Sequence, residues 1–201
     1  MLVALLLPET FAISFTFHAK DSPACKPSND LQHFLHNSEL QEKITKDWIR
    51  THELSNWKVS RPVLVTNPSD FAEIAENSIP FPHNNNEQKM FYFKTEYDST
   101  VKLPSILKPI MKTTIYTHTV KKSFVVGNRE FKVIEVSNIP LISSIKIYSK
   151  MIMYPNGVIA SKNDVATGHV PWYADWAKGH IRKEITNSAQ DYQKMLSNAM
   201  C

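Results

Sequence analysis

The sequence contains little cysteine and little glycine, and both scarcities narrow the possible functions. Its 201 residues include two cysteines, Cys25 and Cys201, and four glycines. Two cysteines without a C-x-x-C pair are too few for a disulfide framework or a zinc finger. Four glycines argue against a nucleotide-binding loop, because such loops need several glycines where the backbone approaches a phosphate.

The sequence also lacks long hydrophobic runs and recognisable catalytic motifs. No run reaches the roughly 20 residues that a membrane-spanning helix needs, and no G-x-S-x-G, H-E-x-x-H or nucleophile–base pair occurs. His33 and His36 follow Asp30 at helical spacing, but no further ligand accompanies them, so a polar surface explains them better than a metal. We therefore expect no catalytic residue, no metal site and no cofactor.

The first 19 residues leave two interpretations open. Their apolar start resembles a secretory signal, yet no basic residue precedes it and Pro8 interrupts it. The alternative is a first strand over residues 12–19, preferred here because apolar side chains alternate with smaller or polar ones from Phe11 to Phe17.

The positive charge of the chain is unevenly distributed. Of its 23 Lys and Arg residues, eleven lie in residues 89–150 with only four acidic residues, a local net charge of +7 in a chain of net charge +4. This asymmetry indicates an acidic partner or an anionic lipid surface. A solvated sheet face rich in lysine is the other interpretation. The spread of the lysines along strands argues against nucleic-acid binding.

The hydrophobic pattern predicts one α+β domain over residues 1–201. After the first strand we expect two short helices, about six antiparallel strands, and a long C-terminal helix from Pro171. Ser38 and Gln41 form a capping box for the second helix. The expected helices, strands and hairpins cover residues 28–35, 38–48, 53–66, 70–76, 89–97, 113–126 with 129–136, 145–154 with 158–166, and 171–199. A curved antiparallel sheet wrapped around the long helix would leave a cavity between them.

Residues 101–111, VKLPSILKPIM, form an apolar segment interrupted by two prolines. Pro109 argues against a continuous helix, and the number of apolar side chains argues against a solvated loop. Two interpretations remain, a helical lid over an apolar pocket and a buried connection that fills the core. The predicted lid residues are Leu103, Pro104, Ile106, Leu107, Ile110 and Met111.

The lid segment and the region after it resemble the PRELI/MSF1 family of mitochondrial phospholipid-transfer proteins. The lid reads KLP-x-x-LKP-x-[LM], and residues 136–155, VSNIPLISSIKIYSKMIMYP, are similar to two consecutive strands of that family. The likeness covers residues 89–195. It implies a helix-grip, START-like fold and the non-enzymatic transfer of an anionic phospholipid of the phosphatidic acid type.

The resemblance also implies which residues bind the lipid. Lys94 before the lid, Lys102 at its hinge and Asn187 on the last helix correspond to the family's phosphate contacts. Lys150 matches the basic member of a Glu-Arg pair, although Ser149 replaces the glutamate and strand alternation turns Lys150 away from its apolar neighbours. The family's Lys-Gly-Arg on the last helix and its N-terminal Tyr-Pro-Asn are missing, which leaves the lipid class open.

The partners and the location follow from the same resemblance. It implies transient contact with an anionic membrane, a small twin-cysteine helical chaperone, and the mitochondrial intermembrane space; the alternative location is the cytoplasm. The alternative function is that of another START-like protein, either a carrier of a small hydrophobic molecule or a polyketide-cyclase-like enzyme. In the enzyme, His118 would act as a base inside the cavity.

Overall fold

The structure is a computed structural model, and the elements that it describes follow the predicted order. The predicted helix over residues 28–35, with His33 and His36, lies outside the described residues. It describes residues 10–11, 14–19, 38–76, 79–82, 89–101, 115–139, 144–154, 158–168, 170–171 and 177–200. The elements are β1 (Thr10–Phe11), β2 (Ser14–Ala19), α2 (Ser38–His52), β3 (Ser55–Val59), β4 (Val63–Leu64), η1 (Pro68–Asp70), α3 (Ala72–Ala75), β5 (Met90–Val101), β6 (Ile115–Val126), β7 (Arg129–Ser137), β8 (Ile145–Met153), β9 (Ile159–Thr167), β10 (Val170–Pro171) and α4 (Ala177–Met200).

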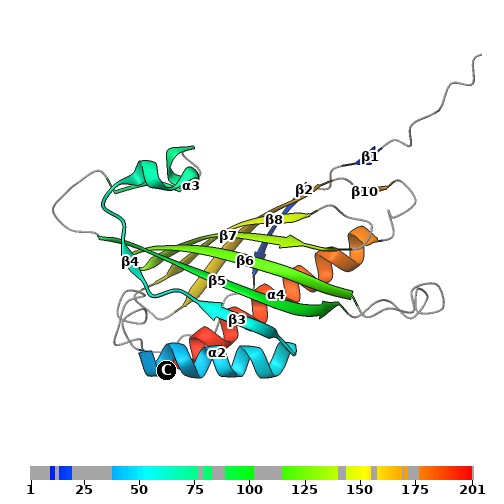
Figure 1. Cartoon of the computed structure of the whole chain (residues 1–201), viewed down its shortest axis with the longest axis horizontal. Coiled ribbons are helices and arrows are strands. Elements are labelled where there is room, and N and C mark those ends of the chain that lie inside the picture. The colour runs from blue at the N-terminus through cyan, green and yellow to red at the C-terminus, as the bar shows by residue number, and fades with distance from the viewer. Residues whose placement is uncertain are drawn as a thin grey trace, which may run out of the picture.

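All described strands except β1 and β10 form one open antiparallel sheet with α4 across one of its faces (Figure 1). Seven strands follow one another in the order β2-β9-β8-β7-β6-β5-β3, and β4 pairs with β5 as well. All of the pairings are antiparallel, and the edge strands β2 and β3 do not pair with each other. The α+β arrangement of a sheet and a C-terminal helix is therefore as predicted.

Local sequence signals set the turns and helix starts. Gly127 takes a φ of 54° between β6 and β7, a conformation that glycine adopts without a Cβ clash. The predicted hairpin at Gly127-Asn128 is thus confirmed, as is the strand Ser14–Ala19. Helix α2 begins at Ser38, where the capping box predicts it.

One predicted boundary is wrong. Pro171 does not begin the last helix but pairs with Thr10 in the two-stranded ladder of β1 and β10, and α4 begins at Ala177. A proline fixes φ near −65°, a value that suits both the first turn of a helix and an edge strand that needs no N–H donor. The residue type alone could not decide between them.

Alternation along the strands gives the sheet two different faces. In β8 and β9, every second residue is buried, which is the period-two pattern of a strand with one face in the core. Helix α4 packs on this face, and its inward side chains recur at three or four residues. They are Ile185, Ala189, Tyr192 and Leu196.

A second core lies on the opposite face, under η1 and α3. Phe124 of β6 is completely buried there, while its neighbour Val125 belongs to the core beneath α4. The carboxylate of Glu73 in α3 lies 2.6 Å from the Lys122 Nζ of β6. Consecutive residues of β6 therefore pack in two different cores, one on each face of the sheet.

Ion pairs neutralise several lysines of the basic region on this outer face. Lys94 pairs with Glu96, and the Lys146 Nζ lies 3.5 Å from Glu135. Such exposed pairs contribute only about 0–1 kcal/mol each. Their presence favours the interpretation of a solvated, lysine-rich sheet face over that of a single basic patch.

Candidate functional site

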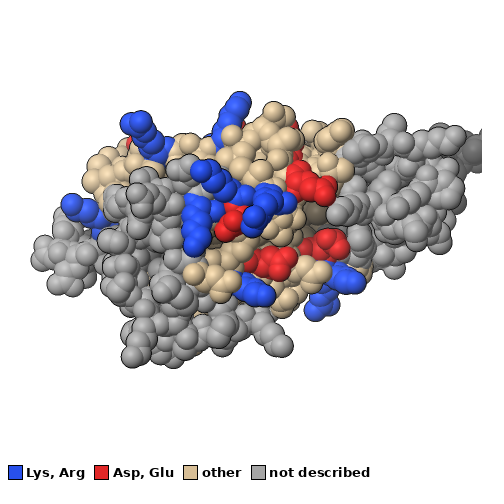
Figure 2. Space-filling view, turned by 90° about the horizontal axis from the view of Figure 1, so that it is seen from below, with Lys and Arg blue, Asp and Glu red and all other residues tan. Residues whose placement is uncertain are grey.

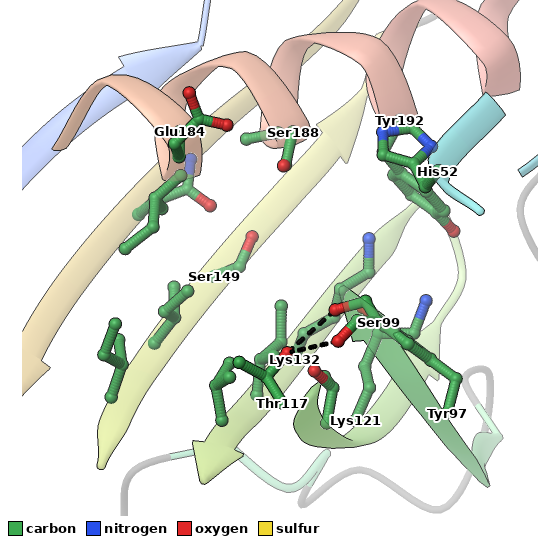
Figure 3. A pocket seen from close by; sticks show the side chains of 18 of the residues that line it. His52, Tyr97, Ser99, Thr117, Lys121, Lys132, Ser149, Glu184, Ser188 and Tyr192 are labelled. Carbon is green, nitrogen blue, oxygen red and sulfur yellow. Dashed lines mark hydrogen bonds between the residues drawn. The ribbon is translucent and has the colours of Figure 1, made fainter. Parts of the chain in front are cut away.

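A cavity of about 370 Å³ lies between α4 and the sheet (Figure 3). Its wall is built by strands β5 to β9, by α4 and by the C-terminal end of α2. The aliphatic part of this wall consists of Leu54, Ile134, Val136, Ile139, Ile145, Ile147, Ile185 and Ala189. An apolar wall of this kind suits the hydrocarbon part of a ligand.

Polar side chains cross the sheet in one row beside the aliphatic wall. Ser123, Lys132, Ser149 and Asn163 are direct partners on the neighbouring strands β6 to β9. All four are buried, between 0% and 9% exposed. Three of them, Lys132, Ser149 and Asn163, line the cavity, which therefore combines an apolar section with a polar section.

Two lysines of the cavity wall point toward the same aromatic ring of α4. Figure 3 shows Lys121 and Lys132 directed from the sheet toward Tyr192. The Nζ atoms lie 4.7 Å and 3.9 Å from the Tyr192 ring centroid. The Lys132 Nζ also lies 3.1 Å from Glu130, and both members of that pair are at least 94% buried. A desolvated cation over an aromatic face is stabilised by about 2 kcal/mol.

The surroundings of Lys121 and Lys132 disfavour a positive charge on both side chains. Burial, together with the nearby charge of Lys132, lowers the pKa of Lys121 to about 8, and Glu130 opposes the shift. Burial also lowers the pKa of Lys132, against the attraction of Glu130. Burial raises the pKa of Tyr192 well above its ordinary value, so this phenol stays neutral. Ionisable groups perturbed by burial and by a like charge are typical of functional sites.

Two buried oxygens next to the lysines lack a hydrogen-bond partner among the described residues. They are Oε1 of Glu130 and Oγ of Ser123. A buried polar atom without a partner costs about 1–3 kcal/mol. Neither Ser123 nor Glu130 lines the cavity, so the two atoms show only that the core next to its polar section is incompletely hydrogen-bonded.

The lipid-binding residues predicted from the resemblance lie elsewhere. Lys94 and Lys150 are on the outer face of β5 and β8, and Asn187 is exposed on α4. None of these three lines the cavity. The spacing explains their position, because inward residues of β5 and β8 are the odd-numbered ones and Asn187 lies two residues from both Ile185 and Ala189. Lys102 and the lid residues from Leu103 to Met111 lie outside the described residues.

Sequence reasoning missed Lys121, Lys132 and Tyr192 as a group. Strand alternation could have placed both lysines on the cavity side, since each is two residues from an inward residue of its own strand. Thr117 and Thr119 precede Lys121 on the cavity side, and Ile134 follows Lys132. A lysine in an inward position deserves a functional explanation because lysine is seldom buried without a partner.

His118 lies on the outer face and not in the cavity. Its Nδ1 is 2.8 Å from Oδ1 of Asp98, whose other oxygen accepts a 2.6 Å hydrogen bond from Asn56 Nδ2. The hydrogen bonds from Asn56 and His118 lower the pKa of Asp98. Since His118 is not part of the cavity wall, it does not supply the base that the cyclase-like alternative requires.

Two findings bear on the predicted membrane contact and on the predicted family. Among the helices that the structure describes, none is long and apolar enough to cross a membrane. No protein-family model and no curated protein matches the sequence, and the resemblance to the PRELI/MSF1 family stays a prediction.

Proposed function

We propose that the protein is a non-enzymatic lipid-binding protein that holds an amphipathic lipid between α4 and the sheet and transfers it between membranes. The observation that supports this most is the 370 Å³ cavity with its aliphatic wall. Each buried methylene of an acyl chain contributes about 0.8 kcal/mol. A cavity that excludes water is therefore sufficient for binding, and no chemical step is needed.

The finer part of the proposal comes from the resemblance in residues 89–195. It adds a START-like helix-grip fold, a phosphatidic acid-type ligand and the lid of residues 101–111. It also adds the intermembrane space and a twin-cysteine chaperone as partner. The described structure is compatible with the lid, because β5 ends at Val101 and β6 begins at Ile115, and Ser99, Thr100 and Thr117 near those ends line the cavity.

The surface on the side of α2 and α4 carries both signs of charge. Figure 2 shows lysine or arginine next to aspartate or glutamate on this face. Lys43, Lys46 and Arg50 are exposed on α2, and Glu184 and Asp191 are exposed on α4. The cationic side chains are the groups on this face that would contact an anionic membrane.

The test of this function is lipid extraction from vesicles. The purified protein is incubated with vesicles of phosphatidylcholine containing phosphatidic acid, separated from them by flotation and analysed by native mass spectrometry. We expect a protein–lipid complex of one to one, and transfer of a fluorescent lipid to acceptor vesicles. A protein that emerges without lipid and does not accelerate transfer would contradict the proposal.

Single-chain lipids belong in the same test because the cavity is small. Its 370 Å³ lies near the lower end of the roughly 300–1,000 Å³ range of ligand sites. Lysophosphatidate, oleate and monooleoylglycerol should therefore be offered beside the two-chain lipid. If only the single-chain lipids bind, the function is that of a carrier for smaller amphiphiles, the second function that the cavity volume favours.

A double substitution in the predicted lid tests its role in transfer. Replacing Leu107 and Ile110 with serine should strongly reduce lipid transfer and lower the melting temperature little, because gating segments belong to the least stable parts of a fold. If the segment fills the core instead, each truncation should cost about 2–5 kcal/mol of stability. A large fall in melting temperature, with transfer lost only in proportion to unfolded protein, would reject the lid.

A further inference from the structure

We propose that Lys121 and Lys132 bind the acidic group of the ligand, so that an anionic amphiphile lies in the cavity with its head inward and its chain toward the end lined by Ser99 and Thr100. This inference rests on the proposed lipid-binding function and specifies the ligand class and its orientation. It places the head group at residues other than the predicted Lys94, Lys150 and Asn187.

The position of the lysines in the cavity is the first reason. Lys132 belongs to the buried polar row, and Lys121 stands beside Ile134 on the neighbouring strand. Beyond the row, the core beneath the C-terminal half of α4 closes this end. Its buried members are Ile44, Val125, Met151, Met153, Ile159 and Leu196. A charged group is thus located at the closed end and not at the mouth.

The charge balance is the second reason. Lys132 has the carboxylate of Glu130 as partner, whereas in the described part of the chain Lys121 contacts the Tyr192 ring and lies within ion-pair distance of no carboxylate. Two ammonium groups thus share one carboxylate in a largely buried space. A ligand carboxylate or phosphate would supply the second negative charge, and hydrogen bonds to charged groups are the stronger ones in proteins.

Neutral hydrogen-bonding side chains around the lysines are the third reason. Ser149 is the cross-strand partner of Lys132, and Asn163 that of Ser149. Ser161 donates a 3.3 Å hydrogen bond to Gln193 of α4, which binds in turn to the carbonyl of Ile159. The Ser149 hydroxyl and the second N–H of the Asn163 amide, whose first N–H donates to Ser161, can donate to the oxygens of an acidic head group.

The direction of the chain follows from the rest of the wall. From the lysines, the cavity runs along Ile145, Ile147 and Ile185 to Ser99 and Thr100. Glu184 of α4 lines the cavity next to Ile185 and is exposed, so the cavity lies close to the surface at that end. The hydrocarbon part of the ligand then occupies the aliphatic section, and its end lies closest to the mouth.

A matched pair of ligands and a matched pair of variants test this site. Lysophosphatidate and monooleoylglycerol share one acyl chain and differ in the acidic group, and oleate offers a carboxylate in place of the phosphate. We expect Lys121→Met to weaken the binding of both acids about tenfold or more, and to leave monooleoylglycerol unchanged. Lys150→Met, on the outer face of the same sheet, should change none of the three affinities.

The possible outcomes distinguish an error in the head-group site from an error in the lipid-binding function. If the wild type binds the acids and the neutral lipid equally, or if Lys121→Met weakens all three alike, the head-group site is wrong and lipid binding stands. If the wild type binds none of the three, the proposed function fails and the head-group site fails with it. A preference for oleate over lysophosphatidate, or the reverse, identifies the acidic group that fits.

The pH dependence of wild-type binding gives a measurement that needs no variant. Other titratable groups around Lys121 are Lys132 and Glu130 from β7, Tyr192 from α4, Tyr97 from β5 and His52 from α2. The lysophosphatidate phosphate is fully ionised above pH 8. Since the pKa of Lys121 is about 8, affinity for lysophosphatidate should fall between pH 8 and pH 10, while monooleoylglycerol binding stays constant. An unchanged lysophosphatidate affinity over this range would overturn the role of Lys121.

Discussion

Replacing Lys132 with methionine is expected to lower the free energy of unfolding by about 3–5 kcal/mol, because the change leaves a buried carboxylate without its counter-charge. The side chain of Glu130 is 3% exposed, and one of its oxygens has no hydrogen-bond partner among the described residues even with Lys132 present. Urea unfolding followed by circular dichroism measures the loss. A loss below about 1 kcal/mol would show that Glu130 is not held as a buried carboxylate.

The double variant Lys132→Met, Glu130→Met separates the two members of the pair. It removes both charges and keeps much of the volume, and replacing a buried ion pair by apolar residues is often neutral or stabilising. We therefore expect the double variant to be more stable than Lys132→Met alone. The control is the exposed pair Lys146–Glu135 of the outer face, where Lys146→Met should cost about 1 kcal/mol or less.

The same double variant connects stability with binding. The double variant keeps Lys121 without a carboxylate partner, so it should still prefer lysophosphatidate to monooleoylglycerol, but less than the wild type does because the Lys132 contact is gone. Retention of the full preference for the acid in that variant would show that the Lys132–Glu130 pair serves the fold alone. The double substitution should therefore raise stability relative to Lys132→Met and lower the preference for the acid relative to the wild type.

The largest expected effect on binding comes from Ala189→Trp. Ala189 lies on α4, lines the cavity and packs beside Ile145 and Ile147. An indole at this position would occupy the aliphatic section, so every lipid should bind at least about tenfold more weakly, whatever its head group. Because the new side chain enters open space, the stability cost should stay at or below the roughly 1–3 kcal/mol of an overpacked core.

Asn187→Trp is the control for this substitution. Asn187 lies on the same helix, is exposed and does not line the cavity. It should therefore accept tryptophan with lipid binding unchanged. If Ala189→Trp binds lipid like the wild type, the ligand does not occupy the space between α4 and the sheet, and the proposed function needs another site.

The sequence by itself determined most of the elements. Hairpins at Gly127 and around residues 155–157, the start of α2 at Ser38 and the strand Ser14–Ala19 all follow from local signals. These signals work because turns, caps and strand alternation depend on neighbours within a few residues. The predicted start of α4 was wrong because a proline at position 171 fits both an edge strand and the first turn of a helix.

Only the tertiary structure decided which lysines enter the cavity. Lys121 and Lys122 are adjacent in the sequence and equal in chemistry, yet Lys121 faces Tyr192 of α4 and Lys122 pairs with Glu73 of α3. Alternation places them on opposite faces of β6, but the face that α4 covers is set by contacts between residues distant in the sequence. Buried polar groups such as Lys132 and Glu130 depend on these long-range contacts, because their low-dielectric surroundings form only when α4 packs on the sheet.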